Sequence, residues 1–176
     1  MSTQLGKLSV GSTVYLNVNG GKIEFLIVNQ GLPSSDYDDS CNGTWLLMKD
    51  LYTTSAWNKK SNNSYSASLI HSYLNSTFLN LLDSDIKSAV KTVKLPYTNS
   101  TGTDGSVASG SNGLSAQVFL LSYTEVGFSG SSYANVEGDV LSYFNGAADS
   151  KRIAYLNGTA TRWWLRSPLT SNTYYA

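Results

Sequence analysis

The sequence predicts an α+β fold, and three observations support this prediction. An alternation of polar and apolar residues around Asn19, Gly20 and Gly21 predicts an N-terminal β-hairpin. A change to helical spacing after Ser66 predicts two central helices. Short apolar runs set among Gly, Ser and Asn predict several short strands in a loop-rich C-terminal half. Strands and helices grouped in this way are typical of the α+β class.

The first predicted elements are strands. Val14–Val18 and Ile23–Val28 flank the glycine turn and form the two arms of the hairpin. A loop rich in Gly, Pro, Ser and Asp occupies residues 30–42. It leads to Thr44–Met48, whose short apolar run predicts a buried strand. A polar stretch over residues 53–64 separates this strand from the helices.

The two predicted helices occupy the middle of the chain. In the first, side chains recur at spacings of three and four residues, namely Leu69, Ile70, Tyr73, Leu74, Thr77 and Phe78. The second begins with Asp83 or Ser84 as its N-cap, because short polar side chains accept hydrogen bonds from the first free backbone amides. We expect this helix to bury Ile86, Ala89 and Val90.

The C-terminal half is predicted to consist of short pieces. In chain order these are an extended piece at Val93–Tyr97, a long exposed loop at Thr98–Ser115, a strand at Ala116–Ser122, a turn or short helix at Tyr123–Gly127, amphipathic pieces at Asp139–Phe144 and Lys151–Tyr155, and a final strand containing Trp163 and Trp164. The composition of the Thr98–Ser115 segment, rich in Gly, Ser, Thr and Asn, indicates a loop within one domain, because neither flanking part is large enough to fold alone.

Composition excludes several classes of protein. A chain of 176 residues with 41% hydrophobic content is long enough for one domain with a core, which we expect to span residues 1–176. Twelve basic and twelve acidic residues cancel, and no basic stripe is present, so we expect no nucleic-acid partner. No apolar run approaches the ~20 residues of a spanning helix, so we expect no membrane partner. The first residues do not resemble a signal peptide, so synthesis in the cytoplasm is expected.

Catalytic and metal-binding residues are scarce in the sequence, so we expect neither an enzyme nor a cofactor. His71 is the only histidine and lies beside the apolar stripe of the first helix, which favours a structural role. Cys41 is the only cysteine, which excludes an internal disulfide and a cysteine-based metal site. Asp36, Asp38 and Asp39 alternate as calcium ligands do, but the glycine and terminal glutamate of the known loop are missing, and calcium binding there stays open.

The residues from Arg162 to Pro168 and those that follow form the most distinctive part of the chain. In an extended strand, Trp163 and Trp164 point to opposite faces, and Arg166 adds a bidentate cation. The residues after Pro168 are small, polar or tyrosine, a composition typical of adaptable recognition surfaces. The predicted ligand-binding residues are these and one tryptophan expected at the surface: Trp57, Thr170, Ser171, Asn172, Thr173, Tyr174 and Tyr175.

Several segments, taken in order, resemble a family of uncharacterised domains common in phages and gut Firmicutes. The segments are Leu8–Val14, Gly43–Lys49, Ile70–Phe78, Val118–Ser122 and Arg162–Pro168. The resemblance runs from the first of these segments to the last and so spans nearly the whole chain. The last segment, which contains Trp-Trp-Leu-Arg-Ser-Pro, is the specific one.

The resemblance implies a C-type-lectin-like fold, similar to the variable proteins of diversity-generating retroelements. It makes Trp163, Trp164 and Arg166 a structural signature and places the ligand-contacting residues at Leu169–Tyr175. Members of this family usually continue with further strands. We therefore expect this domain to lack its closing C-terminal strands, either because they were removed or because another chain supplies them.

These observations lead to one expected function and one alternative. We expect a non-enzymatic recognition domain of a phage virion, in a tail fibre or tip or on the capsid, that binds a bacterial surface glycan or protein. The alternative is a virion structural or decoration protein that binds other particle subunits and no host ligand. An enzyme related to the formylglycine-generating oxidases is disfavoured, because those enzymes use a pair of cysteines. The expected location is the virion or, alternatively, the bacterial cell surface, and assembly as a homo-oligomer stays open.

Overall fold

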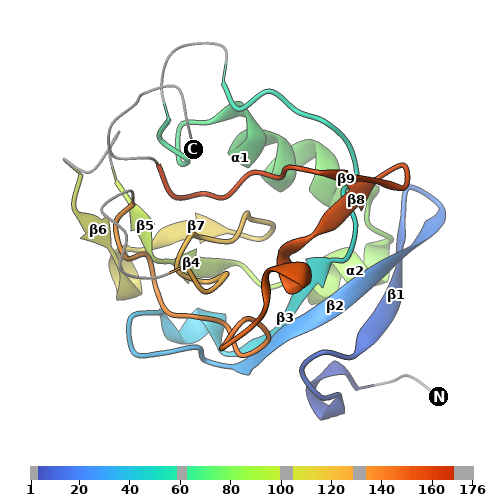
Figure 1. Ribbon diagram of the computed structural model, residues 1–176, viewed down its shortest axis with the longest axis horizontal. Helices are drawn as coiled ribbons and strands as arrows, with labels where there is room; N and C mark the ends of the chain where they lie inside the picture. The colour runs from blue at the N-terminus through green and yellow to red at the C-terminus, as the bar shows by residue number, and fades with distance from the viewer. Residues whose placement is uncertain (1–3, 59–62, 100–104, 129–133, 169–176) are drawn as a thin grey trace.

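Small antiparallel sheets and short helices make up the described part of the chain, which comprises residues 4–58, 63–99, 105–128 and 134–168 of a computed structural model (Figure 1). This mixture agrees with the α+β class. The strands are β1 (Thr13–Val18), β2 (Gly21–Gly31), β3 (Gly43–Met48), β4 (Val93–Leu95), β5 (Tyr97–Thr98), β6 (Val107–Ala108), β7 (Leu114–Ala116), β8 (Ala154–Leu156) and β9 (Thr159–Thr161). They form one sheet in the order β1-β2-β3 and the pairs β4-β7, β5-β6 and β8-β9.

The predicted hairpin and the following strand are confirmed. β1 and β2 pair in antiparallel register, with Val14 opposite Phe25. The turn between them places Asn19 at φ 52° and Gly20 at φ 74°, the left-handed conformation that two-residue hairpin turns need. β3 then pairs with the other edge of β2.

A bulge in β2 between Ile27 and Asn29 connects the sheet to the C-terminal half. The Val28 carbonyl accepts a hydrogen bond from the Tyr143 amide at 3.0 Å. The Asn29 side chain accepts from the Ser142 hydroxyl at 2.6 Å and from the Ser142 amide at 3.3 Å. Because a bulge leaves one residue without a partner strand, its backbone is free to bond elsewhere.

The predicted helices are present, but the first changes character along its length. α1 (Leu69–Tyr73) begins at Ser68, whose hydroxyl accepts from the His71 amide, and runs on into a π-helical turn (η3, Leu74–Phe78) and a 3₁₀ turn (η4, Leu79–Leu81). α2 (Ser84–Ala89) has Asp83 at its N-cap. Thr77 and Ala89 are exposed, contrary to expectation. No helix in the described ranges is long and apolar enough to cross a membrane.

The remaining short helical turns are all of the 3₁₀ type. They are η1 (Leu5–Lys7), η2 (Asp39–Cys41), η6 (Gly110–Asn112) and η7 (Asp149–Arg152). The last overlaps the start of the predicted amphipathic piece at Lys151–Tyr155, and the end of that piece lies in β8. The predicted turn at Tyr123–Gly127 is confirmed.

Two strand predictions in the C-terminal half are wrong. Within Ala116–Ser122, only Ala116 lies in a strand, at the end of β7. The segment from Arg162 to Pro168 belongs to no strand, since β9 ends at Thr161. The predicted loop at Thr98–Ser115 is also wrong in part, because it contributes to β5, β6 and β7.

Side chains replace the missing strand partners of residues 117–122. The side-chain oxygen of Asn75 accepts from the amides of Gln117 at 2.7 Å and Val118 at 3.2 Å. The nitrogen of the same Asn75 amide donates to the Val118 carbonyl at 2.9 Å. The Tyr65 hydroxyl accepts from the Leu120 amide at 3.0 Å. Because these partners are side chains on and before a helix, alternation of apolar residues could not reveal them.

Three clusters of buried side chains form the core. The first joins β2 and β3 to the C-terminal half, and the second packs the hairpin on η3 and η4. The third contains Trp57, Tyr65 and Ile70, with Trp164 packed against them. In Figure 1 the segment after β9 crosses between α1 and the β4-β7 pair, which is where this third cluster lies.

We predict that Gly20→Ala lowers the free energy of unfolding by about 1 kcal/mol, because an alanine at φ 74° meets the steric cost of the left-handed region. Urea denaturation measures this change. Gly6→Ala is the matched control, since a Cβ there meets no atom within 4 Å and Gly6 has no positive φ. Equal stabilities for the two variants would contradict the assigned turn.

Candidate functional site

The two tryptophans of the signature segment point in opposite directions, as predicted. Trp163 packs against the first core cluster, and its indole nitrogen donates to the Arg152 carbonyl at 2.9 Å. Trp164 packs against the third cluster and donates to the Ser55 carbonyl at 3.2 Å. The segment therefore joins two separate parts of the core without belonging to a sheet.

Arg166, two residues further, is completely buried. Its guanidinium donates to both oxygens of Glu125, with Nη1 2.6 Å from Oε2 and Nη2 2.7 Å from Oε1. Its Nε donates to the Pro96 carbonyl at 3.1 Å, and Nη1 also reaches the Leu120 carbonyl at 3.0 Å. Such a bidentate pair is the strongest arrangement available to arginine and a carboxylate.

Glu125 holds further partners around this ion pair. The Tyr37 hydroxyl donates to its Oε1 at 2.8 Å, and the Ser122 amide donates to its Oε2 at 2.8 Å. The Ser122 hydroxyl in turn accepts from the Glu125 amide at 3.0 Å. The carboxylate of Glu125 therefore ties the loop near Tyr37 and the turn at residues 122–125 to Arg166.

A second buried carboxylate, Glu137, completes the network. Its Oε1 accepts from the Thr98 amide at 2.6 Å and its Oε2 accepts from the Ser167 hydroxyl at 2.7 Å. Arg166 Nε lies 3.7 Å from the same Oε2. Ser167 also accepts from the Tyr123 amide at 3.0 Å. Two carboxylates thus face one guanidinium, and backbone or hydroxyl donors supply the remaining contacts.

The electrostatics follow from burial and from this pairing. Burial alone would lower the pKa of Arg166, but the carboxylates of Glu125 and Glu137 outweigh it and raise that pKa above its usual range. Burial, helped by the charge of Glu125, raises the pKa of Tyr37. A cluster with no exposed surface is suited to holding chain segments together rather than to contacting a substrate.

Trp57 does not lie at the surface, which corrects the sequence-based expectation. Its side chain is 9% exposed, with its ring 5.4 Å from that of Trp164 and 5.9 Å from that of Tyr65. The polar residues around Trp57 in the sequence hide this position, because its burial depends on Trp164 from the far end of the chain. No described residue accepts a hydrogen bond from its indole nitrogen.

The other predicted ligand-binding residues follow the buried part of the signature. Thr170, Ser171, Asn172, Thr173, Tyr174 and Tyr175 lie outside the described residues. The three residues before Leu169, namely Arg166, Ser167 and Pro168, are all buried. Of the signature residues, Trp163 and Trp164 pack against two core clusters, and Arg166 is fully buried.

His71, Cys41 and Asp38, which the sequence analysis considered for catalysis or metal binding, each contact neighbouring groups of the fold. The His71 ring lies 4.9 Å from that of Tyr65, and burial lowers its pKa. The Cys41 thiol is buried against the Lys94 carbonyl, and burial raises its pKa. Asp38 caps η2 by accepting from the Ser40 amide. Among the described residues, no group of three acidic, histidine or cysteine side chains could hold a metal ion.

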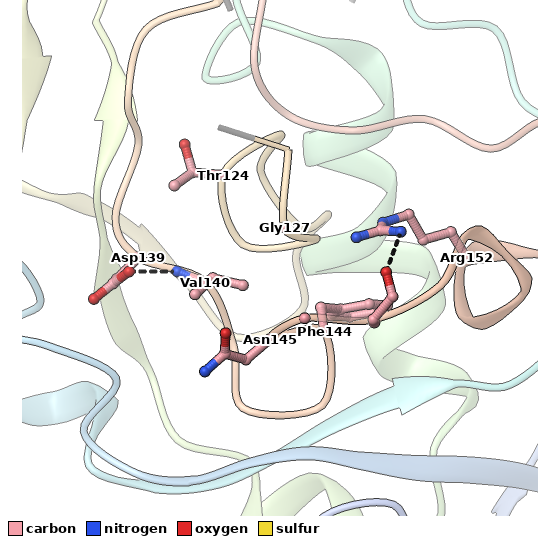
Figure 2. Close-up of a pocket in the computed structure, with 9 residues that line it drawn as sticks. Thr124, Gly127, Asp139, Val140, Phe144, Asn145 and Arg152 are labelled. Carbon is pink, nitrogen blue, oxygen red and sulfur yellow. Dashed lines mark hydrogen bonds between the residues drawn. The ribbon is translucent and has the colours of Figure 1, made fainter. Parts of the chain in front are cut away.

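One pocket of about 270 Å³ opens beside the turn at residues 124–127. Figure 2 shows Asp139 and Arg152 on opposite sides of this pocket, with Asn145 between them. The described residues that line it are Thr124, Gly127, Asp139, Val140, Phe144, Asn145, Gly146, Ala147 and Arg152. Trp57 is not among the residues that line this pocket, and the sequence analysis did not identify the pocket.

Glu125 and Glu137 were also missed, although the sequence carries a signal for them. Arginine is rarely buried unless it is paired, and Arg166 follows three large apolar residues, Trp163, Trp164 and Leu165. Glutamate is rare in this chain, so a search for the partners of a buried arginine would have considered both residues.

Comparison with known proteins gives one match. The sequence model of a family described as a domain of unknown function (DUF6273) matches residues 42–176. This range contains the signature segment, both buried glutamates and all residues that line the pocket. No curated protein and no solved structure matches the chain significantly.

We predict that Glu125→Gln destabilises the fold by about 3 kcal/mol, because it breaks a fully buried ion pair and leaves Arg166 opposite a neutral amide. Glu24→Gln, which breaks the exposed pair with Lys49, is the control and should change stability little. Urea denaturation of both variants measures the difference. A similar small effect in both would show that the buried network contributes little.

We also predict that stability falls as the pH rises from 10 to 12. Burial raises the pKa of Tyr65 to about 12, so the unfolded chain loses this proton at lower pH than the folded chain does. The stabilisation by the buried Tyr65 hydroxyl is complete below pH 10. Between pH 10 and 12, Tyr65 lowers the free energy of unfolding by about 1.4 kcal/mol for each pH unit. Denaturation across this range should give a smaller slope for Tyr65→Phe than for the exposed-site control Tyr15→Phe. Equal slopes would contradict the prediction.

Proposed function

This chain belongs to the DUF6273 family of domains of unknown function, and we propose that it is a non-enzymatic recognition domain of a phage virion. In this proposal the domain sits in a tail fibre or tip or on the capsid and binds a bacterial surface glycan or protein. Residues Thr170 to Tyr175 supply the main ligand contacts.

The observation that carries the proposal is the anchoring of the residues immediately before this segment. Arg166 and Ser167 are buried and bonded to Glu125 and Glu137, and Pro168 is buried as well. Recognition residues are most effective when a rigid scaffold positions them, because less conformational entropy is lost on binding. The buried network supports this role by fixing the point in the chain that precedes Leu169.

The composition of the segment supports recognition rather than chemistry. Tyrosine offers a large contact area with few rotatable bonds, and Ser, Thr and Asn supply adaptable hydrogen bonds. Tyr174 and Tyr175 are adjacent and follow four small polar residues. The charged groups of the network have no exposed surface, so we assign them a scaffolding role and propose no catalytic activity.

We further propose that the fold is C-type-lectin-like. The order of elements supports this proposal: an N-terminal hairpin precedes α1 and α2, and a loop-rich half with short strands follows. The structural signature of Trp163, Trp164 and Arg166 joins that half to the rest of the core.

A second candidate function is a virion structural or decoration protein. Exposed apolar side chains favour it, because such groups dock onto other subunits. Tyr15 on β1 is 64% exposed and Tyr155 on β8 is 44% exposed. In this case the domain has no host ligand, and these side chains contact neighbouring subunits or a second copy of the chain.

Binding of the purified domain to intact cells of candidate host bacteria separates the two functions. We predict saturable binding that Tyr174→Ala/Tyr175→Ala reduces at least about tenfold, because it removes both large contact groups. Tyr15→Ala/Tyr155→Ala is the matched control and should bind as the unaltered domain does. Circular dichroism confirms that each variant is folded. Unchanged binding by the first variant would contradict the assignment. Absence of binding to every strain, with assembly into oligomers that Tyr15→Ala/Tyr155→Ala weakens, would support the structural function.

A further inference from the structure

The pocket between the turn at residues 124–127 and the segment 139–147 combines polar groups with carbon surface. Asp139, Asn145, Thr124 and Arg152 supply polar groups, while Val140 supplies carbon surface. Its volume of about 270 Å³ is below the roughly 300 Å³ at which clefts for drug-sized ligands begin. We therefore expect a ligand smaller than a drug-sized molecule, on the scale of a single ring.

Several polar atoms of the pocket have capacity left for a ligand. Asp139 accepts from the Val140 amide through Oδ1, and no described residue donates to its other oxygen (Figure 2). Asn145 is exposed and has no hydrogen bond to a described side chain or backbone group. The Thr124 hydroxyl accepts from the Glu137 amide and keeps its own proton to donate.

Arg152 is held firmly but keeps one unused nitrogen. Its Nε donates to the Val126 carbonyl at 2.6 Å, and its Nη1 donates to the Ala147 carbonyl and to Asp149 at 3.2 Å. No acceptor for Nη2 exists in the described ranges. A Cβ on Gly127 would lie 2.8 Å from this Nη2, so the glycine at φ 85° leaves the space beside it open.

An aromatic side chain stands next to the pocket. Phe128 follows Gly127, its ring is stacked on that of Tyr123 at 4.8 Å, and the Arg152 guanidinium lies 4.8 Å above the Phe128 ring. Phe128 is 37% exposed, so part of its ring remains available. The exposed part of this ring offers an apolar contact beside the polar groups.

We propose that this pocket binds one neutral pyranose ring. The hydroxyls of a pyranose both donate and accept, which suits a carboxylate, a primary amide, a hydroxyl and a guanidinium placed around one small space. Its C–H face suits the carbon surface of Val140 and of the neighbouring Phe128. A neutral sugar fits better than an anionic one, because Asp149 already pairs with the Arg152 guanidinium and Asp139 adds a carboxylate on the opposite side of the pocket.

This inference deepens the proposed recognition function, on which its biological meaning rests, and it adds a site whose described lining residues fall between Thr124 and Arg152 in the sequence. The ring could come from a free sugar or from the end of a bacterial surface glycan, and both present the same hydroxyl chemistry. Binding in the pocket itself does not require that Tyr174 and Tyr175 contact a ligand.

Nuclear magnetic resonance titration of the full chain tests the proposal. The probes are the methyl glycosides of glucose, galactose, mannose, rhamnose and N-acetylglucosamine, with the amide shifts of residues 124–127 and 139–152 as readout. We expect at least one glycoside to shift these amides in a saturable manner. Asp139→Ala/Asn145→Ala should weaken this binding at least about tenfold, because both side chains are exposed and can be truncated without loss of buried contacts.

Matched variants separate this proposal from the proposed function. Asn80→Ala/Asp85→Ala removes an amide and a carboxylate beside and on α2, away from the pocket lining, and should leave the shifts unchanged. Tyr174→Ala/Tyr175→Ala should also keep them, even if it abolishes binding to cells. No saturable shift with any glycoside, or shifts that persist in Asp139→Ala/Asn145→Ala, would overturn the pocket proposal whatever the result with cells.

Tighter binding of oligosaccharides cut from a host polysaccharide would identify the glycan terminus as the source, and binding of the glycosides alone would identify a free sugar.

Discussion

The C-terminal half of this protein depends on the burial of one arginine between two glutamates. Arg166, Glu125 and Glu137 have no exposed surface, and isolated charges in such a place would cost several kcal/mol each. The cost is offset only because the guanidinium and both carboxylates find nearly complete sets of partners. This requirement fixes where the segments around Tyr37, Thr98 and residues 120–125 must lie. A loop-rich half thereby gains a defined arrangement without an extended sheet.

Elsewhere in the fold, side chains also form the hydrogen bonds to backbone groups that a neighbouring strand would otherwise form. Asn75 satisfies the backbone of Gln117 and Val118, and Tyr65 accepts from the Leu120 amide. Asn75 lies in the π-helical turn, a feature found frequently where a helix serves a particular contact. The helix, the extended segment and the signature therefore form one connected unit. The features we relate to binding are the pocket beside Gly127 and the residues that follow Pro168 in the sequence.

The sequence predicted the parts of the fold that local patterns determine. The hairpin turn at Asn19-Gly20, the strand β3 and the start of α2 after Asp83 follow from residue type and spacing. The strands expected near Val118 and Trp163 were wrong, since the partners of these segments are single side chains from distant positions. The opposite orientation of Trp163 and Trp164 was correct, but burial of Trp57 depends on a ring from the end of the chain. The pocket combines residues from three segments, none of which carries a recognisable motif.

Native-state hydrogen exchange tests most directly whether the network around Arg166 holds the C-terminal half together. The amides of Thr98, Ser122 and Tyr123 donate to side chains of Glu137, Glu125 and Ser167 rather than to a neighbouring strand. The account predicts that they exchange only through global unfolding, with the same free energy as the Ile27 amide in β2. Exchange of these amides through local opening, at a free energy well below that of Ile27, would contradict it.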